Sequence, residues 1–183
     1  MSRSIETRPS DIVDFWREAG PSCWFAGSEA FDRRCERFRE AHFAASRCEL
    51  DDWMQSPEGA LALLILLDQI PRNLFRGSAH AYATDALARH HASRAVDLGM
   101  DQQTESLLRP FVYLPFQHSE AMADQERSLE LFGSLAGPDA DKWARHHHAI
   151  IERFGRFPHR NELLGRVSTP SEQSFLDSGG FGG

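Results

Sequence analysis

The sequence predicts an all-α protein, built from about seven or eight helices in stacked antiparallel pairs that form a bundle or a short solenoid. Three observations lead to this fold class. Apolar residues recur every three or four positions along almost the whole chain. No run alternates between apolar and polar residues as a half-buried strand does. Capping residues and glycine or proline stops divide the chain at short intervals, so we expect short loops.

The first two helices are marked by hydroxyl caps. Ser10 can cap a first helix that ends at Gly20, which is followed by a proline. Ser28 can cap a second helix that reaches about Phe43. Each helix carries aromatic residues on one stripe, so both are expected to pack against a common core.

The third helix is expected over Glu58 to about Ile70. Ser56 followed by Pro57 is a favoured entry, with a hydroxyl at the cap and proline at the first helical position. The helix is apolar around its whole circumference, which predicts burial on all sides and a place at the hub of the core. We expect Pro71 to break it and a polar turn to follow.

The rest of the chain carries similar helix start and stop signals. A threonine cap at Thr169 with Glu172 three residues later is a capping box for a short last helix. Glycines stop the preceding helices. We expect these helices over residues 79–98 or 84–98, 101–114 or 104–114, 119–135, 139–154 and 170–176.

A chain of 183 residues suits one domain with a sizeable core. We expect that domain over residues 10–176, with a flexible N-terminus at 1–9 and a flexible tail at 177–183, where four of seven residues are glycine. Seven or so helices without a repeat in the letters leave the choice between bundle and solenoid open.

Charge and composition limit the function classes. The net charge of −7 opposes binding to nucleic acid or to an anionic membrane surface. The longest apolar run is too short to cross a bilayer, and the N-terminus lacks the apolar stretch of a secretion signal. Three widely spaced cysteines fit neither a disulfide scaffold nor a zinc site. We therefore expect a cytoplasmic protein.

Positive charge gathers in one segment of this acidic chain. Residues 153–161 contain three arginines, a histidine and an asparagine among apolar residues. Arginine keeps its charge, so such a cluster requires carboxylates, phosphates, carbonyls or a bound anion as partners. The alternatives are neutralisation of acidic helices of the same protein and attraction of an anionic ligand.

Two histidines fall on predicted inward faces. His118 and Gln125 lie in line with three core residues of the helix at 119–135. His147 lies on the stripe of Trp143, Ile150 and neighbouring apolar residues in the next helix. The alternatives are buried histidines bonded to backbone carbonyls and members of a polar site.

Asp68 and Arg72 are four residues apart, so they can pair if the turn after Pro71 stays helical. The pair is either a helix-end salt bridge or a device that orients the arginine toward an anion. No histidine or carboxylate pair has metal-ligand spacing on one helix face, and no nucleotide-binding loop occurs. We therefore predict no metal and no cofactor.

Three stretches together carry a family resemblance: residues 67–77, 111–120 and 150–161. Over about Ile12 to Leu176 the chain resembles the bacterial family catalogued as domain of unknown function 924. The resemblance implies a fold grouped with the tetratricopeptide-like helical superfamily and no established activity. The family's usual His-Arg-Asp-Ile-Ile pattern is matched by residues 147–151, with His147 retained and histidine and alanine replacing the charged pair. Gln117 stands where members often carry glutamate.

These observations lead to one main hypothesis and two alternatives. The main hypothesis is a polar pocket that binds an anionic small molecule or a peptide carboxylate, formed by the end of the third helix, the start of the sixth and the turn after the seventh. One alternative is a cofactor-independent enzyme acting on an acidic metabolite, with a histidine as general base. The other is a helical scaffold that binds a peptide in a groove. The candidate catalytic residues are His118, His147 and Glu120, and the candidate ligand-binding residues are Asp68, Arg72, Gln125, Arg153, Arg156, His159 and Arg160.

Overall fold

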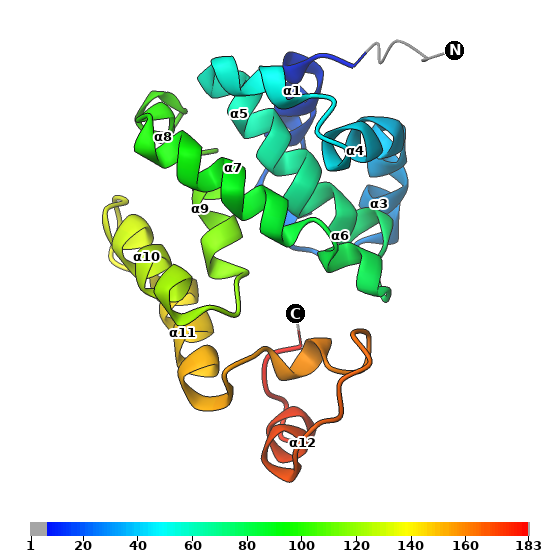
Figure 1. Cartoon of the computed structure of the whole chain (residues 1–183), viewed down its shortest axis with the longest axis vertical. Coiled ribbons are helices and arrows are strands. Elements are labelled where there is room, and N and C mark those ends of the chain that lie inside the picture. The colour runs from blue at the N-terminus through cyan, green and yellow to red at the C-terminus, as the bar shows by residue number, and fades with distance from the viewer. Residues whose placement is uncertain (1–6, 183) are drawn as a thin grey trace. The chain divides into compact units, whose positions relative to one another are not determined.

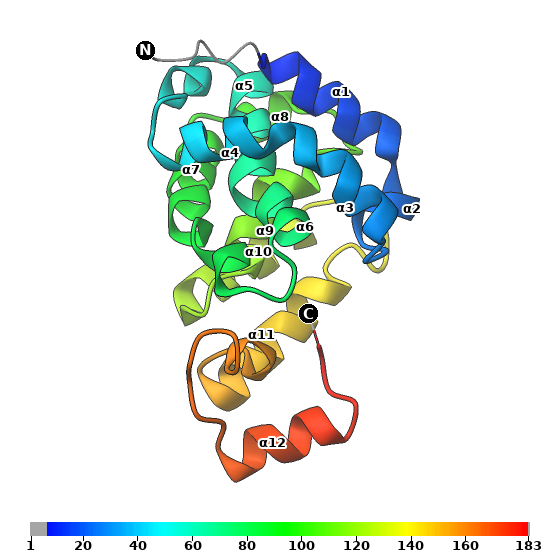
Figure 2. The same ribbon diagram turned by 90° about the vertical axis from the view of Figure 1, so that its right-hand side faces the viewer.

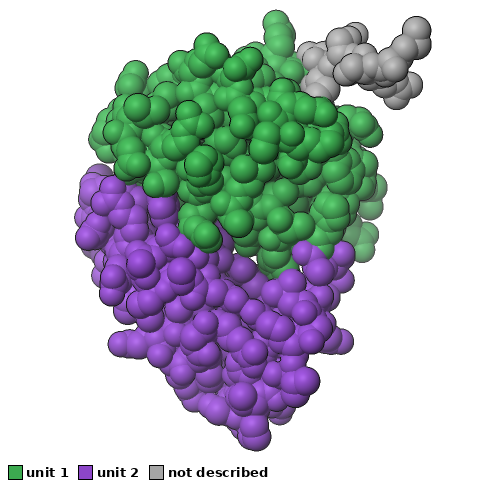
Figure 3. Space-filling model, in the orientation of Figure 1, with its two compact units in different colours: residues 1–76, 80–115 green, residues 77–79, 116–183 purple. Residues whose placement is uncertain are grey.

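The computed structural model describes residues 7–182, and every regular element within them is helical (Figure 1). The predicted all-α class is confirmed. Most of the expected flexible N-terminus, residues 1–6, and the last residue of the expected flexible tail, residue 183, lie outside the described residues. The chain divides into two compact units, coloured separately in Figure 3: unit 1 is residues 1–76 and 80–115, and unit 2 is residues 77–79 and 116–183. The single domain over residues 10–176 stays a prediction.

Unit 1 is built around α5, whose side chains are buried from Gly59 onward. α5 contacts α1 and α7, and α4 contacts the turn that follows α5 (Figure 2). The predicted hub of the core is therefore confirmed for this unit. The helices of this part of the chain are α1 (Pro9–Ala19), α2 (Pro21–Trp24), α3 (Glu29–Cys35), α4 (Arg39–Ser46), α5 (Pro57–Leu64), α6 (Ile70–Leu74), α7 (Asp85–Asp97), α8 (Met100–Gln103) and α9 (Pro110–Gln117), of which Phe116 and Gln117 belong to unit 2.

The expected break at Pro71 is wrong, because the helix continues through it. A π turn over Ile65–Gln69 joins α5 to α6, and Pro71 lies in the first turn of α6. Proline has no N–H to give to a carbonyl one turn earlier. The carbonyls of Leu66 and Leu67 instead accept hydrogen bonds from side chains of other elements. The donors are His42 Nδ1 at 2.8 Å and Thr84 Oγ1 at 2.5 Å.

Two other expectations in unit 1 need correction. α1 begins at Pro9, so Ser10 lies inside the helix, and the backbone N–H of Arg8 donates to the carboxylate of Asp11 at the helix start. The helix expected from 101 or 104 to about 114 is two helices, α8 and α9. Thr104 has an extended conformation that ends α8, and Pro110 opens α9 at the position that proline favours.

Unit 2 contains α10 (Met122–Gly133), α11 (Lys142–Phe154), a 3-10 turn at Pro158–Arg160 and α12 (Pro170–Asp177). α10 packs against α11 (Figure 1). α11 ends at Gly155, which has φ of +68°, a conformation that glycine adopts without strain. The predicted capping box of α12 is confirmed: Thr169 Oγ1 accepts from the N–H of Glu172 at 3.2 Å, and the Glu172 carboxylate accepts from the N–H of Thr169 at 2.7 Å.

The buried face of α11 is offset from the predicted stripe. His147, Ile150 and Ile151 are buried as expected. Trp143, however, is 57% exposed, and Ala144 takes the buried place one residue later. The helix thus turns its small alanine inward and leaves the indole on the surface.

Candidate functional site

The ten candidate residues divide between the two units. Asp68 and Arg72 belong to unit 1, and the other eight belong to unit 2. The single pocket expected to unite all ten therefore stays a prediction, and each group has its own surroundings.

In unit 1, Arg72 is held by two carboxylates. Its guanidinium forms two hydrogen bonds to Asp85 at 2.9 and 3.0 Å and lies 3.3 Å from Asp68 Oδ1. The predicted pairing of Asp68 with Arg72 is thus confirmed. Burial by itself opposes the charge on Arg72, but the two carboxylates together raise the pKa of this arginine above its ordinary value. The arrangement joins the end of α6 to the first turn of α7.

Two imidazoles meet in unit 2. The ring centroids of His118 and His147 are 6.4 Å apart. α10 begins only at Met122, so His118 lies before the helix rather than on it, contrary to the predicted stripe. His147 is on α11 and is buried, and its Nδ1 lies 2.8 Å from the carbonyl oxygen of Trp143 one turn earlier.

The bond to Trp143 defines the chemistry of His147. A carbonyl oxygen only accepts, so Nδ1 carries the proton, and in the neutral ring Nε2 is left with a lone pair. Burial, with the nearby imidazole of His118, lowers the pKa of His147 to about 3. At neutral pH the residue is therefore an uncharged acceptor. A group with so low a pKa is a weak general base.

Glu120 is the acidic centre of the unit 2 group. It accepts hydrogen bonds from both terminal nitrogens of Arg166, at 2.6 and 2.9 Å, and from the backbone N–H of Phe157 at 2.8 Å. Burial alone would raise the pKa of Glu120, but these hydrogen bonds lower it below its usual range. Glu120 thus stays ionised and fixes the turn that carries Phe157.

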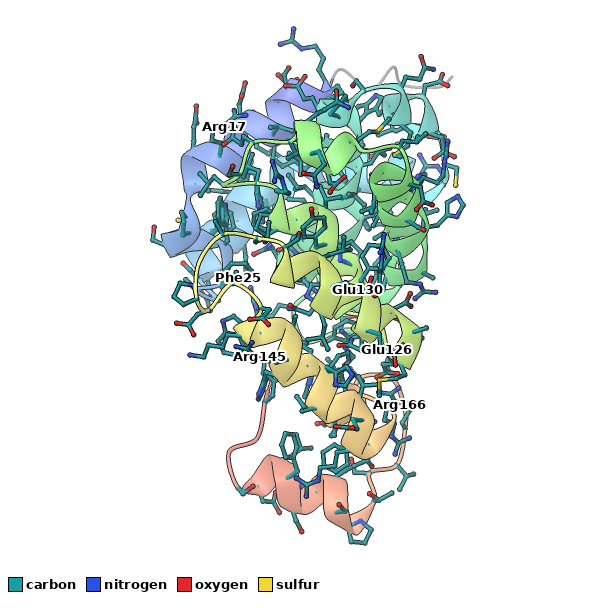
Figure 4. All side chains as sticks on the ribbon, turned by 90° about the vertical axis from the view of Figure 1, so that its left-hand side faces the viewer. Arg17, Phe25, Glu126, Glu130, Arg145 and Arg166 are labelled. Carbon is teal, nitrogen blue, oxygen red and sulfur yellow. The ribbon has the colours of Figure 1, made fainter. Side chains whose placement is uncertain are left out.

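Arg166 was missed as a site residue by sequence reasoning. Besides Glu120, it donates to the side-chain oxygen of Asn161 at 3.0 Å and to the carbonyl oxygen of Phe157 at 3.1 Å. Figure 4 places Arg166 beside the C-terminal end of α11. Only its place in a positively charged segment could have drawn attention to it, since its partner Glu120 is 46 positions away.

The guanidinium of Arg156 is taken by another carboxylate. It donates to both oxygens of Glu172, at 2.6 and 2.8 Å, and to the carbonyl oxygen of Val167. Hydrogen bonding to Arg156 lowers the pKa of Glu172 to about 2. The same carboxylate caps α12, so Arg156 joins the end of α11 to the start of α12.

Arg153 lies on the exposed side of α11. Its guanidinium carbon is 4.6 Å from the ring centroid of Phe154 and 5.7 Å from that of Phe175. This position is typical of an arginine that covers aromatic surface while its charge stays in water.

Gln125 is fully buried on α10, and its orientation is fixed by backbone carbonyls. Its Nε2 donates to the carbonyl oxygens of Ser119 at 2.6 Å and Gln117 at 2.8 Å, with that of Phe116 at 3.5 Å. An amide oxygen could not face three acceptors, so the assignment of nitrogen and oxygen follows from the surroundings. Gln125 therefore holds together the turn that carries His118.

The remaining candidate residues, His159 and Arg160, lie with His147 around the buried ring of Phe157. Phe157 is fully buried. The ring centroids of His147 and His159 lie 5.5 and 5.7 Å from its centroid, and the guanidinium carbon of Arg160 lies 4.6 Å from it. Arg160 is itself only 6% exposed. We call His118, His147, Phe157, His159 and Arg160 the Phe157 cluster.

The described residues contain no group of three or more His, Cys, Asp and Glu side chains placed to hold a metal ion. Within residues 7–182, no helix is long and apolar enough to cross a membrane.

Comparison with known proteins agrees with the resemblance. The family model described as "Bacterial protein of unknown function (DUF924)" matches residues 12–180. A solved structure of a protein of unknown function from Agrobacterium tumefaciens is similar, with a TM-score of 0.90 and 52% sequence identity, and the match covers 93% of this chain and 97% of that one. A search of curated proteins found no match. The chain belongs to the bacterial DUF924 family of proteins of unknown function.

Proposed function

We propose that unit 2 binds an anionic small molecule at the Phe157 cluster. The observation that carries the proposal is the convergence of His147, His159 and Arg160 on the single ring of Phe157. These side chains come from α11 and from the 3-10 turn after it. A guanidinium and an imidazole that can donate are groups that recognise a carboxylate or phosphate, and the acceptor atom Nε2 of His147 can take a hydrogen bond from a hydroxyl or amide on the same carbon skeleton.

The charges around the cluster favour an anion. Glu120 lies close to His118 in the sequence, and its charge is balanced by Arg166. Arg160 adds a further positive charge, which acts on both Glu120 and His147. At His147, the neighbouring groups His118, His146 and Arg160 all act against a further positive charge, so an anion complements these surroundings.

The proposal gives the candidate residues different parts. Arg160 supplies charge, His118 and His159 supply hydrogen bonds, and the Nε2 atom of His147 accepts a hydrogen bond from a ligand hydroxyl or amide. Glu120 and Gln125 position the turns that carry these groups. Arg156 and Arg153 lie against Glu172 and against aromatic rings, which supports a structural part for both.

Binding is better supported than catalysis at His147. A general base works best with a pKa near the working pH, whereas burial and His118 hold the pKa of His147 at about 3. In a catalytic version of this site, proton transfer would fall to His118, and His147 would orient the ligand.

The test measures the binding of carboxylates and phosphates to the protein by thermal shift and by calorimetry. A ligand at about 100 times its dissociation constant stabilises the native state by about 2.7 kcal/mol. We expect Arg160→Gln to abolish the shift and Arg153→Gln, which changes an exposed arginine of the same unit, to retain it. Circular dichroism of both variants checks that they fold. Equal binding by the two variants would place the ligand elsewhere.

A further inference from the structure

The segment after α12 folds back onto the cluster. Ser178 to Gly182 follows the end of α12 and runs back toward α11 (Figures 2 and 4). The backbone N–H of Gly180 donates to the carbonyl oxygen of Phe175 at 2.9 Å. Gly179 has φ of +78°, so the turn that reverses the chain depends on glycine.

Phe181 lies against the histidines of unit 2. Its ring centroid is 4.7 Å from that of His147, 5.1 Å from that of His159 and 5.4 Å from that of His146. The ring is half-buried and packs on the apolar group of Ile150, Ile151 and Phe157. Phe181 thus touches two of the imidazoles that the proposed ligand would need.

We propose that Ser178–Gly182 is an autoinhibitory strap, with Phe181 packed against His147 and His159 and blocking the approach of a ligand to them. This inference rests on the proposed anion site, because the strap regulates access to it. The strap is held by the phenyl ring of Phe181, by a few backbone hydrogen bonds to the end of α12 and by the hydrogen bond from the Ser178 hydroxyl to the Phe175 carbonyl. Its glycines gain conformational freedom on release. Such a segment opens locally at small cost, as ligand-gating elements do.

The glycines of the strap provide variants that leave every site residue intact. A Cβ atom on Gly180 would lie 2.5 Å from the carbonyl oxygen of Phe175 and 2.7 Å from its ring, so Gly180→Ala must displace the strap. A Cβ atom on Gly182 meets no atom within 4 Å, so Gly182→Ala is the matched control. Phe181→Ala removes the covering ring itself.

The experiment measures how fast diethyl pyrocarbonate modifies His147 in the full chain, by mass spectrometry of each histidine. The exposed His90 of unit 1 serves as internal reference. We expect roughly tenfold faster modification of His147 in Phe181→Ala and in Gly180→Ala, the change produced by about 1.4 kcal/mol of lost closing free energy. Gly182→Ala should match the unaltered protein. Unchanged modification of His147 in Phe181→Ala would overturn the strap.

Binding of inorganic phosphate and citrate distinguishes failure of the strap proposal from failure of the proposed anion site. If the site and the strap are both real, either opening variant binds one of these anions more tightly than the unaltered protein, and adding Arg160→Gln removes binding. Faster modification of His147 without anion binding by any variant would retain the strap and reject the proposed function. Anion binding that depends on Arg160 but is unaffected by Phe181→Ala, with unchanged modification, would retain the function and reject the strap.

Discussion

Arg166 donates two hydrogen bonds to Glu120, at 2.6 and 2.9 Å, and so joins two turns that lie 46 positions apart in the sequence. The same carboxylate accepts from the N–H of Phe157, and the same guanidinium donates to the carbonyl oxygen of Phe157. The pair therefore forms hydrogen bonds with both the N–H and the carbonyl oxygen of Phe157. It holds in place the residue on which His147, His159 and Arg160 converge.

Breaking this pair should loosen the Phe157 turn. We expect Arg166→Met to lower the free energy of unfolding by about 1 to 2 kcal/mol, because a half-buried carboxylate loses charged donors while water still reaches it. Urea denaturation measures the change. Arg153→Met, which removes an exposed arginine, should stay within about 0.5 kcal/mol. Equal effects would show that the Glu120–Arg166 pair contributes no more than surface charge.

The contribution of the pair should also depend on pH. The folded protein lowers the pKa of Glu120, so the stabilisation is present above the unfolded value of 4.5 and is lost as pH falls through the folded pKa. The difference in stability between the unaltered protein and Glu120→Gln should therefore shrink below pH 4.5. A difference that grows on acidification would contradict the described hydrogen bonds.

His147 should make the protein less stable in mild acid. Between its unfolded pKa of 6.5 and its folded pKa of about 3, the unfolded chain binds a proton that the native state does not. As pH is lowered through this range, His147 therefore reduces the free energy of unfolding by up to about 1.4 kcal/mol per pH unit. His147→Asn, whose amide can still donate to the Trp143 carbonyl, should show a correspondingly flatter dependence in urea denaturation. Parallel dependences would mean that His147 titrates normally.

Alanine substitution should change the stability of the protein in opposite directions at Gly59 and at Gly133. A Cβ atom on Gly59 would lie 2.1 Å from the carbonyl oxygen of Trp53, so Gly59→Ala should cost about 1 to 3 kcal/mol or more through overpacking. Gly133 ends α10 with open space at its Cβ position, so Gly133→Ala should stabilise by about 0.4 to 1 kcal/mol. Thermal unfolding of the two variants compares them directly. Shifts of the same sign would contradict the packing around Gly59.

The cap of α12 offers a local test. Removing the hydroxyl in Thr169→Ala leaves the N–H of Glu172 without its acceptor and should cost about 1 kcal/mol. Ser171→Ala, on the exposed side of the same helix, is the control and should change stability little. Amide hydrogen exchange in α12 would locate the effect. Protection that is lost equally in both variants would show that the cap does not matter.

The local features of this fold were predictable from the sequence, and the distant pairings were not. The Thr169–Glu172 box and the stop at Gly155 depend on neighbouring residues alone, and both occur as expected. The Asp68–Arg72 pair also follows from spacing on one helix. The continuation through Pro71 was not predictable, because the partners that satisfy the freed carbonyls, His42 and Thr84, come from other elements.

The candidate site shows the same limit. Stripe reasoning correctly placed His147 and Gln125 among buried residues. It could not show that Arg156 pairs with Glu172 or that Glu120 pairs with Arg166, because the sequence contains many arginines and carboxylates that could pair equally well. Folding decides which arginines meet internal acids. Sequence spacing also does not predict that the guanidinium of Arg160 lies against the ring of Phe157, beside two imidazoles.

The most direct test of the anion site is a titration of the imidazole resonances of His118 and His147 by nuclear magnetic resonance, with the carboxylate or phosphate that gives the largest thermal shift. We expect saturable changes at both imidazoles in the unaltered protein and in Arg153→Gln, and none in Arg160→Gln. Saturation of other resonances while His118 and His147 stay unmoved, or identical titrations in the two arginine variants, would contradict it.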